Sequence, residues 1–337
     1  MRLTLLATAF GLAASAALAA PPGLMLDKTY MPHHDAMAVT AIWYPGDGSG
    51  TTRIVAENPV FQGVEVSTTT RIAPGAHPVV LFSHGMGGMY RTQAWLAAGL
   101  AARGAIVLAV NHPNSTWGDF DMGAGVHHWT RAQDLSTALD ALLAQPDFAG
   151  HIDTSRVMAA GFSFGGWTAL SLGGVRGNHA GTVAAYTRFG ARMEACEMLL
   201  SERVNLQGVA PEDWNGDYAD PRVTHVTAID PGFVWGLEPA DVAGLSVPTQ
   251  LIGFGDAATR MLATDFDASG LRALLPEAQA HQLVPGVHFT AMPLCKPAGA
   301  AILAAEEDDP VCTDPDGTDR AAVHDAIIAL IADQLGL

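Results

Sequence analysis

The segment 161–165 (Gly-Phe-Ser-Phe-Gly) is the feature that most constrains what this chain can fold into. It follows the apolar stretch 156–160, whose composition predicts a strand, and precedes residues 167–172, whose composition predicts the start of a helix. A serine between two glycines on a strand-to-helix turn is the signature of a nucleophile elbow. Because a glycine-rich chain matches this pentapeptide easily by chance, the other parts of such a site must also be found.

Short apolar strands alternate with helix-like segments from residue 36 onward, which predicts a mostly parallel sheet. The near-continuous apolar run 78–82 is typical of a strand buried on both faces. An amphipathic helix is expected over 130–144, with Arg131 and Asp134 away from its leucine face. The last helix is expected to start near Thr318, as its N-cap. The other strands are expected at 37–44, 105–110, 223–229, 249–254 and 281–284, and another helix at 92–103.

Residues 176–221 interrupt this alternation with scattered Arg and Glu, a helical patch and a polar stretch. We predict that this insertion covers the carboxyl edge of the sheet as a lid or as a wall of the substrate pocket. The alternation resumes after it, so residues 20–337 are expected to form one domain.

The first 19 residues have the composition of a secretory signal. A positive start is followed by an apolar run from Leu3 to Leu18, which is short for a membrane span, and by a small-x-small site ending at Ala19. We therefore expect cleavage near Ala19, and a periplasmic or secreted protein without stable membrane insertion. The formal net charge of −17 argues against nucleic acid as a partner, because phosphate binding needs clustered Lys and Arg.

No Cys-x-x-Cys or His-x-x-x-His spacing indicates zinc. Neither a metal ion nor an organic cofactor is expected, because the serine chemistry described below needs none. In an oxidising compartment Cys295 and Cys312, which bracket one C-terminal loop, are the preferred disulfide, and Cys196 is left free. The acidic stretches 308–309 and 314–319 invite a calcium interpretation, but the glycine is misplaced for an EF-hand loop and no glutamate closes it. We expect a solvated acidic loop held by the disulfide.

Groups that follow parallel strands converge on one crevice, so the partners of a nucleophilic Ser163 are sought at strand ends. Chain order requires an acid and then a histidine after the serine. His288 lies just past the last expected strand and is the candidate general base. Asp230 and Asp256 each end a later strand, and either could accept a hydrogen bond from the base and stabilise its cation. Spacing does not separate them, since both lie in turn sequences.

An oxyanion hole needs two backbone N–H groups aimed at the developing negative oxygen. One is expected from Phe164, the residue after the nucleophile. The other is expected from Met86, in the loop 83–88 (Ser-His-Gly-Met-Gly-Gly) that follows the apolar strand. His84 is expected to brace this loop by hydrogen bonding.

These motifs resemble those of the predicted dienelactone hydrolase group of bacterial α/β-hydrolases, which itself resembles the platelet-activating-factor acetylhydrolases. The matching stretches are 81–92, 161–166, 228–232 and 287–289, within roughly residues 30–335. The resemblance implies the α/β-hydrolase fold, with helices on both faces of the sheet, and it gives Ser163, His288, Met86 and Phe164 the roles described above.

The resemblance also bears on the acid. In the acetylhydrolases the acid lies on the strand directly after the insertion, which corresponds to Asp230. In ordinary dienelactone hydrolases and lipases it lies one strand later, nearest to Asp256. The Ile-Asp-Pro-Gly context and the apolar residues 233–235 favour Asp230. True dienelactone hydrolases use a cysteine nucleophile, whereas this chain has Ser163, so the group's name does not identify the substrate.

Together these features predict a serine hydrolase that cleaves small-molecule or lipid-like carboxyl esters through an acyl-enzyme. An amidase, a hydrolase of phospholipid acyl chains or polyesters, and a non-catalytic binding protein on the same fold are the alternatives. Trp214 and Trp235 suggest an apolar acyl pocket, although such residues more often belong to an ordinary core. The oligomeric state is not predicted.

Overall fold

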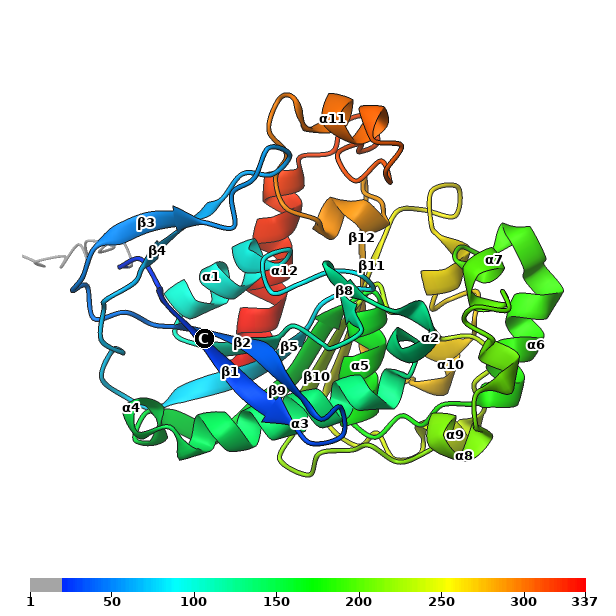
Figure 1. Cartoon of the computed structure of the whole chain (residues 1–337), viewed down its shortest axis with the longest axis horizontal. Helices are drawn as coiled ribbons and strands as arrows, with labels where there is room; N and C mark the ends of the chain where they lie inside the picture. Colours follow the sequence, from blue (N-terminus) through cyan, green and yellow to red (C-terminus); the bar gives the residue numbers. More distant parts are fainter. Residues whose placement is uncertain (1–19) are drawn as a thin grey trace, which may run out of the picture.

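The computed structural model describes residues 20–337, so the expected secretory signal at 1–19 lies outside the described residues. Within them, the largest sheet has ten strands in the order β12-β11-β10-β9-β5-β6-β2-β1-β4-β3 (Figure 1). The six strands from β12 to β6 pair in parallel, which confirms the predicted mostly parallel sheet. They are β5 (His77–Ser83), β6 (Ile106–Val110), β9 (Ile152–Phe162), β10 (His225–Ile229), β11 (Thr249–Phe254) and β12 (Gln279–Leu283).

The other end of the sheet is formed by the N-terminal part of the chain. A hairpin of β1 (Gly23–Met31) and β2 (Ala36–Tyr44) adds to the parallel part because β2 pairs antiparallel with β6. The strands β3 (Thr52–Val55) and β4 (Val64–Ser67) extend this end further. The turn between β1 and β2 therefore lies at the same edge of the sheet as the carboxyl end of β6.

Helices cover both faces of the sheet, and the side-chain alternation along β5 shows why. Val79 and Leu81 face a core shared with α3 (His128–Ala144) and α5 (Phe164–Leu172). Val80 and Phe82 face a second core shared with α1 (Ala94–Ala102) and α12 (Arg320–Leu335). Each such fully buried side chain contributes about 1.5–3 kcal/mol to folding, so both faces must be covered.

The start of α12 differs slightly from the expectation. Asp319, not Thr318, is the N-cap, because its carboxylate accepts a hydrogen bond from the Ala322 N–H at 3.1 Å. The Thr318 N–H instead donates to the Pro315 carbonyl in the preceding turn. An N-cap carboxylate also stabilises the positive end of the helix dipole.

The interrupting segment 176–221 folds into short helices at one end of the molecule (Figure 1). Trp214 is completely buried, with its ring 5.4 Å from that of Phe233, and its carbonyl bonds to His128 Nε2 at 2.9 Å. Trp214 is therefore part of the core rather than of an open pocket. The helices are α6 (His179–Phe189), η1 (Gly190–Arg192), α7 (Cys196–Leu199), η2 (Leu206–Gly208) and α8 (Pro211–Trp214).

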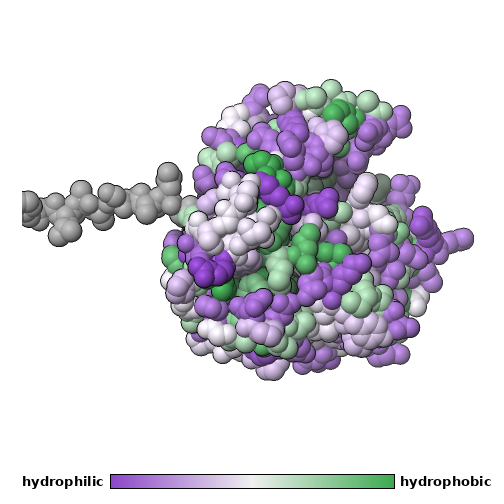
Figure 2. All heavy atoms as spheres, turned by 60° about the vertical axis from the view of Figure 1, so that its left-hand side comes forward, coloured by the Kyte–Doolittle hydropathy of each residue, from purple (hydrophilic) through white to green (hydrophobic). Residues whose placement is uncertain are grey.

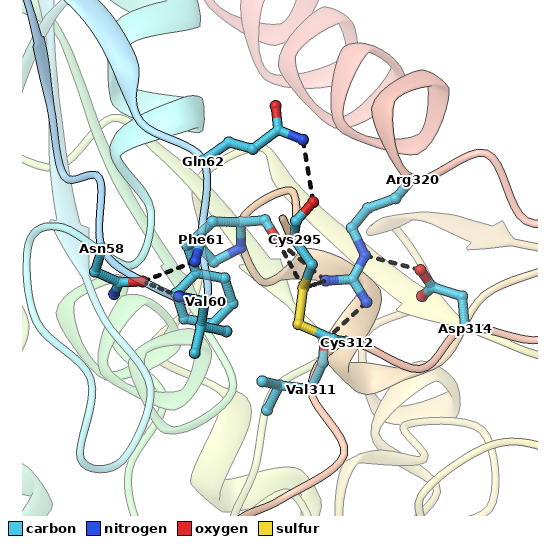
Figure 3. Close-up of a disulfide and its surroundings, with 10 residues drawn as sticks. Asn58, Val60, Phe61, Gln62, Cys295, Val311, Cys312, Asp314 and Arg320 are labelled. Atoms are coloured by element: carbon cyan, nitrogen blue, oxygen red, sulfur yellow. Dashed lines mark hydrogen bonds and ion pairs between the residues drawn. A yellow bond between two sulfur atoms is a disulfide. The ribbon is translucent and has the colours of Figure 1, made fainter. Parts of the chain in front are cut away.

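The C-terminal loop is closed by a Cys295–Cys312 disulfide, as expected (Figure 3), and Cys196 is buried and free. Arg320 donates to the Asp314 carboxylate at 2.8 Å. The other oxygen of Asp314 accepts from the Thr290 hydroxyl at 2.7 Å. The expectation of a simply solvated acidic loop is therefore wrong for Asp314. Its ion pair joins the loop to the start of α12, and its hydrogen bond from Thr290 joins the loop to the turn that carries residue 288.

The surface is mixed in character. Figure 2 shows one face of the molecule, where hydrophobic residues form small separate patches among hydrophilic ones. Among the described residues, no helix combines the length and the hydrophobicity needed to cross a membrane.

Candidate active site

The elbow predicted from 161–165 is present between β9 and α5. Ser163 connects them with φ 58° and ψ −120°, a backbone conformation that costs a residue other than glycine about 1–3 kcal/mol. Two of its backbone hydrogen bonds join it to the segment 229–232: the Ser163 N–H donates to the Ile229 carbonyl at 2.8 Å, and its carbonyl accepts from the Gly232 N–H at 3.1 Å. The side chain is only partly buried, in contrast to its neighbours in the chain.

Close backbone contacts explain the two glycines of the pentapeptide. A Cβ at Gly161 would lie 2.1 Å from the Gly165 carbonyl oxygen. A Cβ at Gly165 would lie 1.9 Å from the carbonyl oxygen of Ser83, at the end of β5. Neither position tolerates a side chain, because the clash is with backbone rather than with a flexible group. The glycines therefore bring the elbow against the neighbouring strand end.

His288 and Asp230 form a buried pair beside this elbow. His288 Nδ1 lies 2.6 Å from Asp230 Oδ2, and both side chains are only 7% exposed. The Asp230 carboxylate also accepts from the Thr264 hydroxyl at 2.8 Å and lies 3.4 Å from the Phe254 N–H. The imidazole packs on the ring of Phe162, which precedes the serine, with centroids 4.6 Å apart.

Among the hydrogen bonds of residues 20–337, none joins His288 to the Ser163 hydroxyl. Contacts of this kind are often long in an enzyme without substrate and tighten when substrate binds. The structure thus brings His288 and Asp230 together and places them next to the elbow.

The other candidate acid lies apart from the histidine. Asp256 is exposed, and its carboxylate closes its own turn by accepting from the Ala258 N–H at 2.9 Å and the Thr259 hydroxyl at 3.2 Å. These hydrogen bonds lower the pKa of Asp256 from its ordinary value. Asp256 therefore has the turn-capping role that is common for aspartate after a glycine.

The loop 83–88 lies directly beside the serine. A Cβ at Gly85 would be 3.3 Å from the Ser163 Cβ. Met86, the next residue, is partly exposed in this loop. Phe164 is the first residue of α5, so its N–H has no acceptor within the helix and is available to a ligand.

Beneath this loop is a buried polar cluster, Ser83, His112, Asp134 and Arg131, that sequence reasoning missed. Ser83 Oγ bonds to His112 Nε2 at 2.9 Å, and His112 Nδ1 bonds to Asp134 Oδ2 at 2.8 Å. Arg131 donates to Ser83 Oγ at 3.0 Å and also to the His84 carbonyl. We call these four residues the inner cluster. One signal could have indicated it, because Ser83 ends the buried parallel strand β5 and His112 comes two residues after the buried parallel strand β6.

The inner cluster supports the loop and the elbow at once. The Arg131 guanidinium lies 4.5 Å from the centre of the Phe164 ring, which belongs to the residue after the serine. His84 braces the loop, as expected, through Nδ1 and the Gly85 carbonyl at 2.7 Å, while its Nε2 is 3.3 Å from the His112 N–H. Burial and the nearby guanidinium lower the pKa of His112 to about 4. His112 is therefore neutral at pH 7.

Comparisons with known proteins agree with this architecture. Residues 54–117, which include the loop 83–88, match the family model described as "Platelet-activating factor acetylhydrolase, isoform II". No curated protein matches the chain. A ferulic acid esterase from Streptomyces cinnamoneus is similar in structure, with a TM-score of 0.56 and 18% sequence identity over 96% of this chain and 92% of that one.

A second similar structure is a dienelactone hydrolase-like promiscuous phosphotriesterase from metagenomic libraries. Its TM-score is 0.51 and its identity 19%, over 92% of this chain and 98% of that chain. The parallel sheet, the elbow and these likenesses define the chain as an α/β-hydrolase by fold, as the sequence motifs predicted.

Proposed function

We propose that this protein is a serine hydrolase that cleaves carboxyl esters, with Ser163 as nucleophile, His288 as general base and Asp230 as the acid. The observation that carries the proposal is the buried His288–Asp230 pair, 2.6 Å apart, beside an elbow that holds Ser163 at positive φ. A buried carboxylate bonded to Nδ1 fixes the tautomer that leaves Nε2 free to accept a proton.

In the proposed reaction His288 Nε2 takes the proton of Ser163 while Oγ attacks the ester carbonyl. The N–H groups of Met86 and Phe164 stabilise the oxyanion that forms. The imidazolium, stabilised by Asp230, then gives its proton to the leaving alcohol as the C–O bond breaks. Water, deprotonated by the same histidine, attacks the acyl-enzyme and releases the acid and the free serine. The hydrogen bond from Thr264 to Asp230 keeps the carboxylate aimed at Nδ1 throughout.

Two observations support an ester with an apolar or aromatic part. A hairpin of β7 (Ser115–Thr116) and β8 (Asp119–Phe120) lies against the loop 83–88, since the Gly87 N–H donates to the Ser115 carbonyl at 3.1 Å. It carries two exposed aromatic rings, Trp117 at 75% and Phe120 at 43%. The similar proteins named above, one an esterase and one dienelactone hydrolase-like, support esters as the substrate class.

The segment 176–221 is proposed as a wall of the substrate pocket. Its residue Phe189 packs on Trp235, with centroids 4.7 Å apart, in the segment that follows β10 and Asp230. The Glu194 carboxylate accepts from the Ala263 N–H at 2.9 Å, next to the threonine that bonds to Asp230. We therefore propose that the segment 176–221 lines the site near Asp230. The aromatic hairpin lines it near the loop 83–88.

We also propose export, with cleavage near Ala19. A disulfide in the C-terminal loop supports an oxidising compartment. Amides, phospholipid acyl chains and polyesters remain the alternative substrates for the same three residues.

Hydrolysis of p-nitrophenyl esters from acetate to decanoate tests the function. We expect cleavage by the mature protein and loss of it in Ser163→Ala and His288→Gln, with Asp256→Asn as the matched control of unchanged activity. Folded protein that cleaves none of these esters would contradict the proposal, and cleavage of an amide panel in its place would favour an amidase.

A further inference from the structure

The turn between β1 and β2 carries two adjacent histidines that meet the inner cluster from outside. His33 Nε2 lies 2.9 Å and His34 Nε2 lies 3.4 Å from the same oxygen of Asp134, Oδ1. All three atoms lie within 4.8 Å of one another. The residues are about a hundred positions apart in the chain (34 to 134), so no local spacing motif reveals the group.

The distances suit a four-coordinate zinc ion. Zinc bound to imidazole nitrogen and carboxylate oxygen at about 2.0–2.1 Å in a tetrahedron requires ligand atoms about 3.3 Å apart. The two histidine-to-aspartate distances, 2.9 and 3.4 Å, lie on either side of this value.

The His34 imidazole has an unpaired nitrogen among the residues that the structure describes. The side chain of His34 is nine-tenths buried, at 9% exposed, and its Nε2 is buried without a hydrogen-bond partner. Leaving a buried polar atom unpaired destabilises the folded state, because the atom has lost its bonds to water. A metal ion between the rings and the carboxylate would satisfy this nitrogen.

The Asp134 carboxylate is already held in a fixed orientation before any ion binds. Asp134 is completely buried, and its other oxygen, Oδ2, is held by His112 Nδ1 at 2.8 Å. A ligand fixed by a hydrogen bond on its far side is the usual second shell of a protein zinc site. The side chain of His33 is 19% exposed, which leaves a path for the ion and a place for a water ligand.

We propose that His33, His34 and Asp134 bind a divalent zinc ion, with water as the fourth ligand. The ion ties the β1–β2 turn to α3. Through Asp134 and His112 it also holds Ser83, where the loop 83–88 begins. This inference does not rest on the proposed esterase activity.

Zinc binding by the untagged mature protein tests the proposal. After dialysis against EDTA, Zn²⁺ is titrated by calorimetry and the melting temperature is recorded with and without the ion. We expect one ion per chain and a higher melting temperature in zinc. In His33→Asn and His34→Gln the affinity should fall at least about 100-fold, since loss of even an outer-shell partner typically costs about 10- to 100-fold.

The matched control is His151→Gln, which should bind zinc like wild type. It changes a half-buried histidine that is bonded to the Gly75 carbonyl and lies just before β9, at the opposite edge of the sheet from the β1–β2 turn. Wild-type protein that binds no zinc, or equal loss of binding in all three variants, would overturn the assignment. If a variant fails to fold, diethylpyrocarbonate labelling of wild type decides the question: zinc should protect His33 and His34 but not His151, and equal labelling with and without zinc would contradict the site.

Discussion

Two sets of Ser, His and Asp lie at the carboxyl edge of this sheet, and they differ in access rather than in composition. In the inner cluster, Ser83 Oγ is bonded to His112, which is bonded to Asp134, and all three side chains are completely buried. In the proposed triad, His288 is bonded to Asp230 in the same way, but Ser163 is partly exposed on a strained turn.

The surroundings separate the two roles. The Ser83 hydroxyl already has both an imidazole and the Arg131 guanidinium as partners, and the same cation helps to keep His112 from taking a proton. A general base must gain a proton during the reaction, so His112 is poorly suited to that role. Ser, His and Asp side chains in the arrangement of a catalytic triad can therefore have a purely structural role when they are buried away from substrate.

The largest effect on kcat is expected when the hydroxyl of Ser163 is removed. Ser163→Ala should lower kcat for p-nitrophenyl acetate by about 10⁴- to 10⁶-fold with unchanged folding, because the nucleophile is lost. Steady-state kinetics together with a thermal melt measure both. A residual rate near that of wild type would show that another group attacks the ester.

The next effect concerns the two aspartates. Asp230→Asn should lower kcat by about 10⁴-fold, because an amide at this place favours the wrong tautomer of His288. Asp256→Asn is the matched control, and should leave kcat within about twofold, since its carboxylate only closes an exposed turn. A larger loss of kcat in Asp256→Asn than in Asp230→Asn would assign the role of the acid to Asp256.

A smaller effect, mainly on stability, is expected in the inner cluster. Ser83→Ala should reduce the free energy of unfolding by about 1–3 kcal/mol, because His112 Nε2 and the guanidinium lose a buried partner. The kcat should change by less than about tenfold, since the serine only positions the loop. Urea unfolding and the acetate assay test this. A loss of activity as large as that of Ser163→Ala would contradict the supporting role.

The smallest effect is expected at the exposed aromatic hairpin. Trp117→Ala should lower kcat/KM for decanoate or aryl esters by about tenfold or less, because apolar contact with the substrate is lost. The value for acetate should hardly change, and a profile across chain lengths measures the difference. An equal loss for all esters would place Trp117 in loop support and not in substrate binding.

The sequence predicted best those parts whose patterns are local. The strand 249–254 matches β11 residue for residue, because a short segment with buried apolar residues lies between Pro248 and Gly255. The strand β1 was not predicted, since Asp27, Lys28 and Thr29 lie at its exposed or half-exposed middle and break any apolar run. Chain order and strand ends led to Ser163 and His288 as candidates.

Contacts between distant segments could not be read from the chain. Spacing left Asp230 and Asp256 equal, the sequence context and the family resemblance favoured Asp230, and the fold shows that Asp230 is the one bonded to His288. Arg131 and Asp134 were interpreted as the polar side of an amphipathic helix, yet they are 1% and 0% exposed. They are buried because that side of α3 faces loop ends that supply polar partners, which helical periodicity does not reveal.

One measurement tests the central claim most directly: labelling of folded mature protein with a fluorophosphonate, followed by mass-spectrometric mapping of the modified residue. The probe reacts with an activated, accessible serine. The account predicts one labelled site, Ser163, and no label on Ser83 despite its hydrogen bond to a histidine. Absence of labelling on folded protein, or a label on any serine other than Ser163, would contradict it.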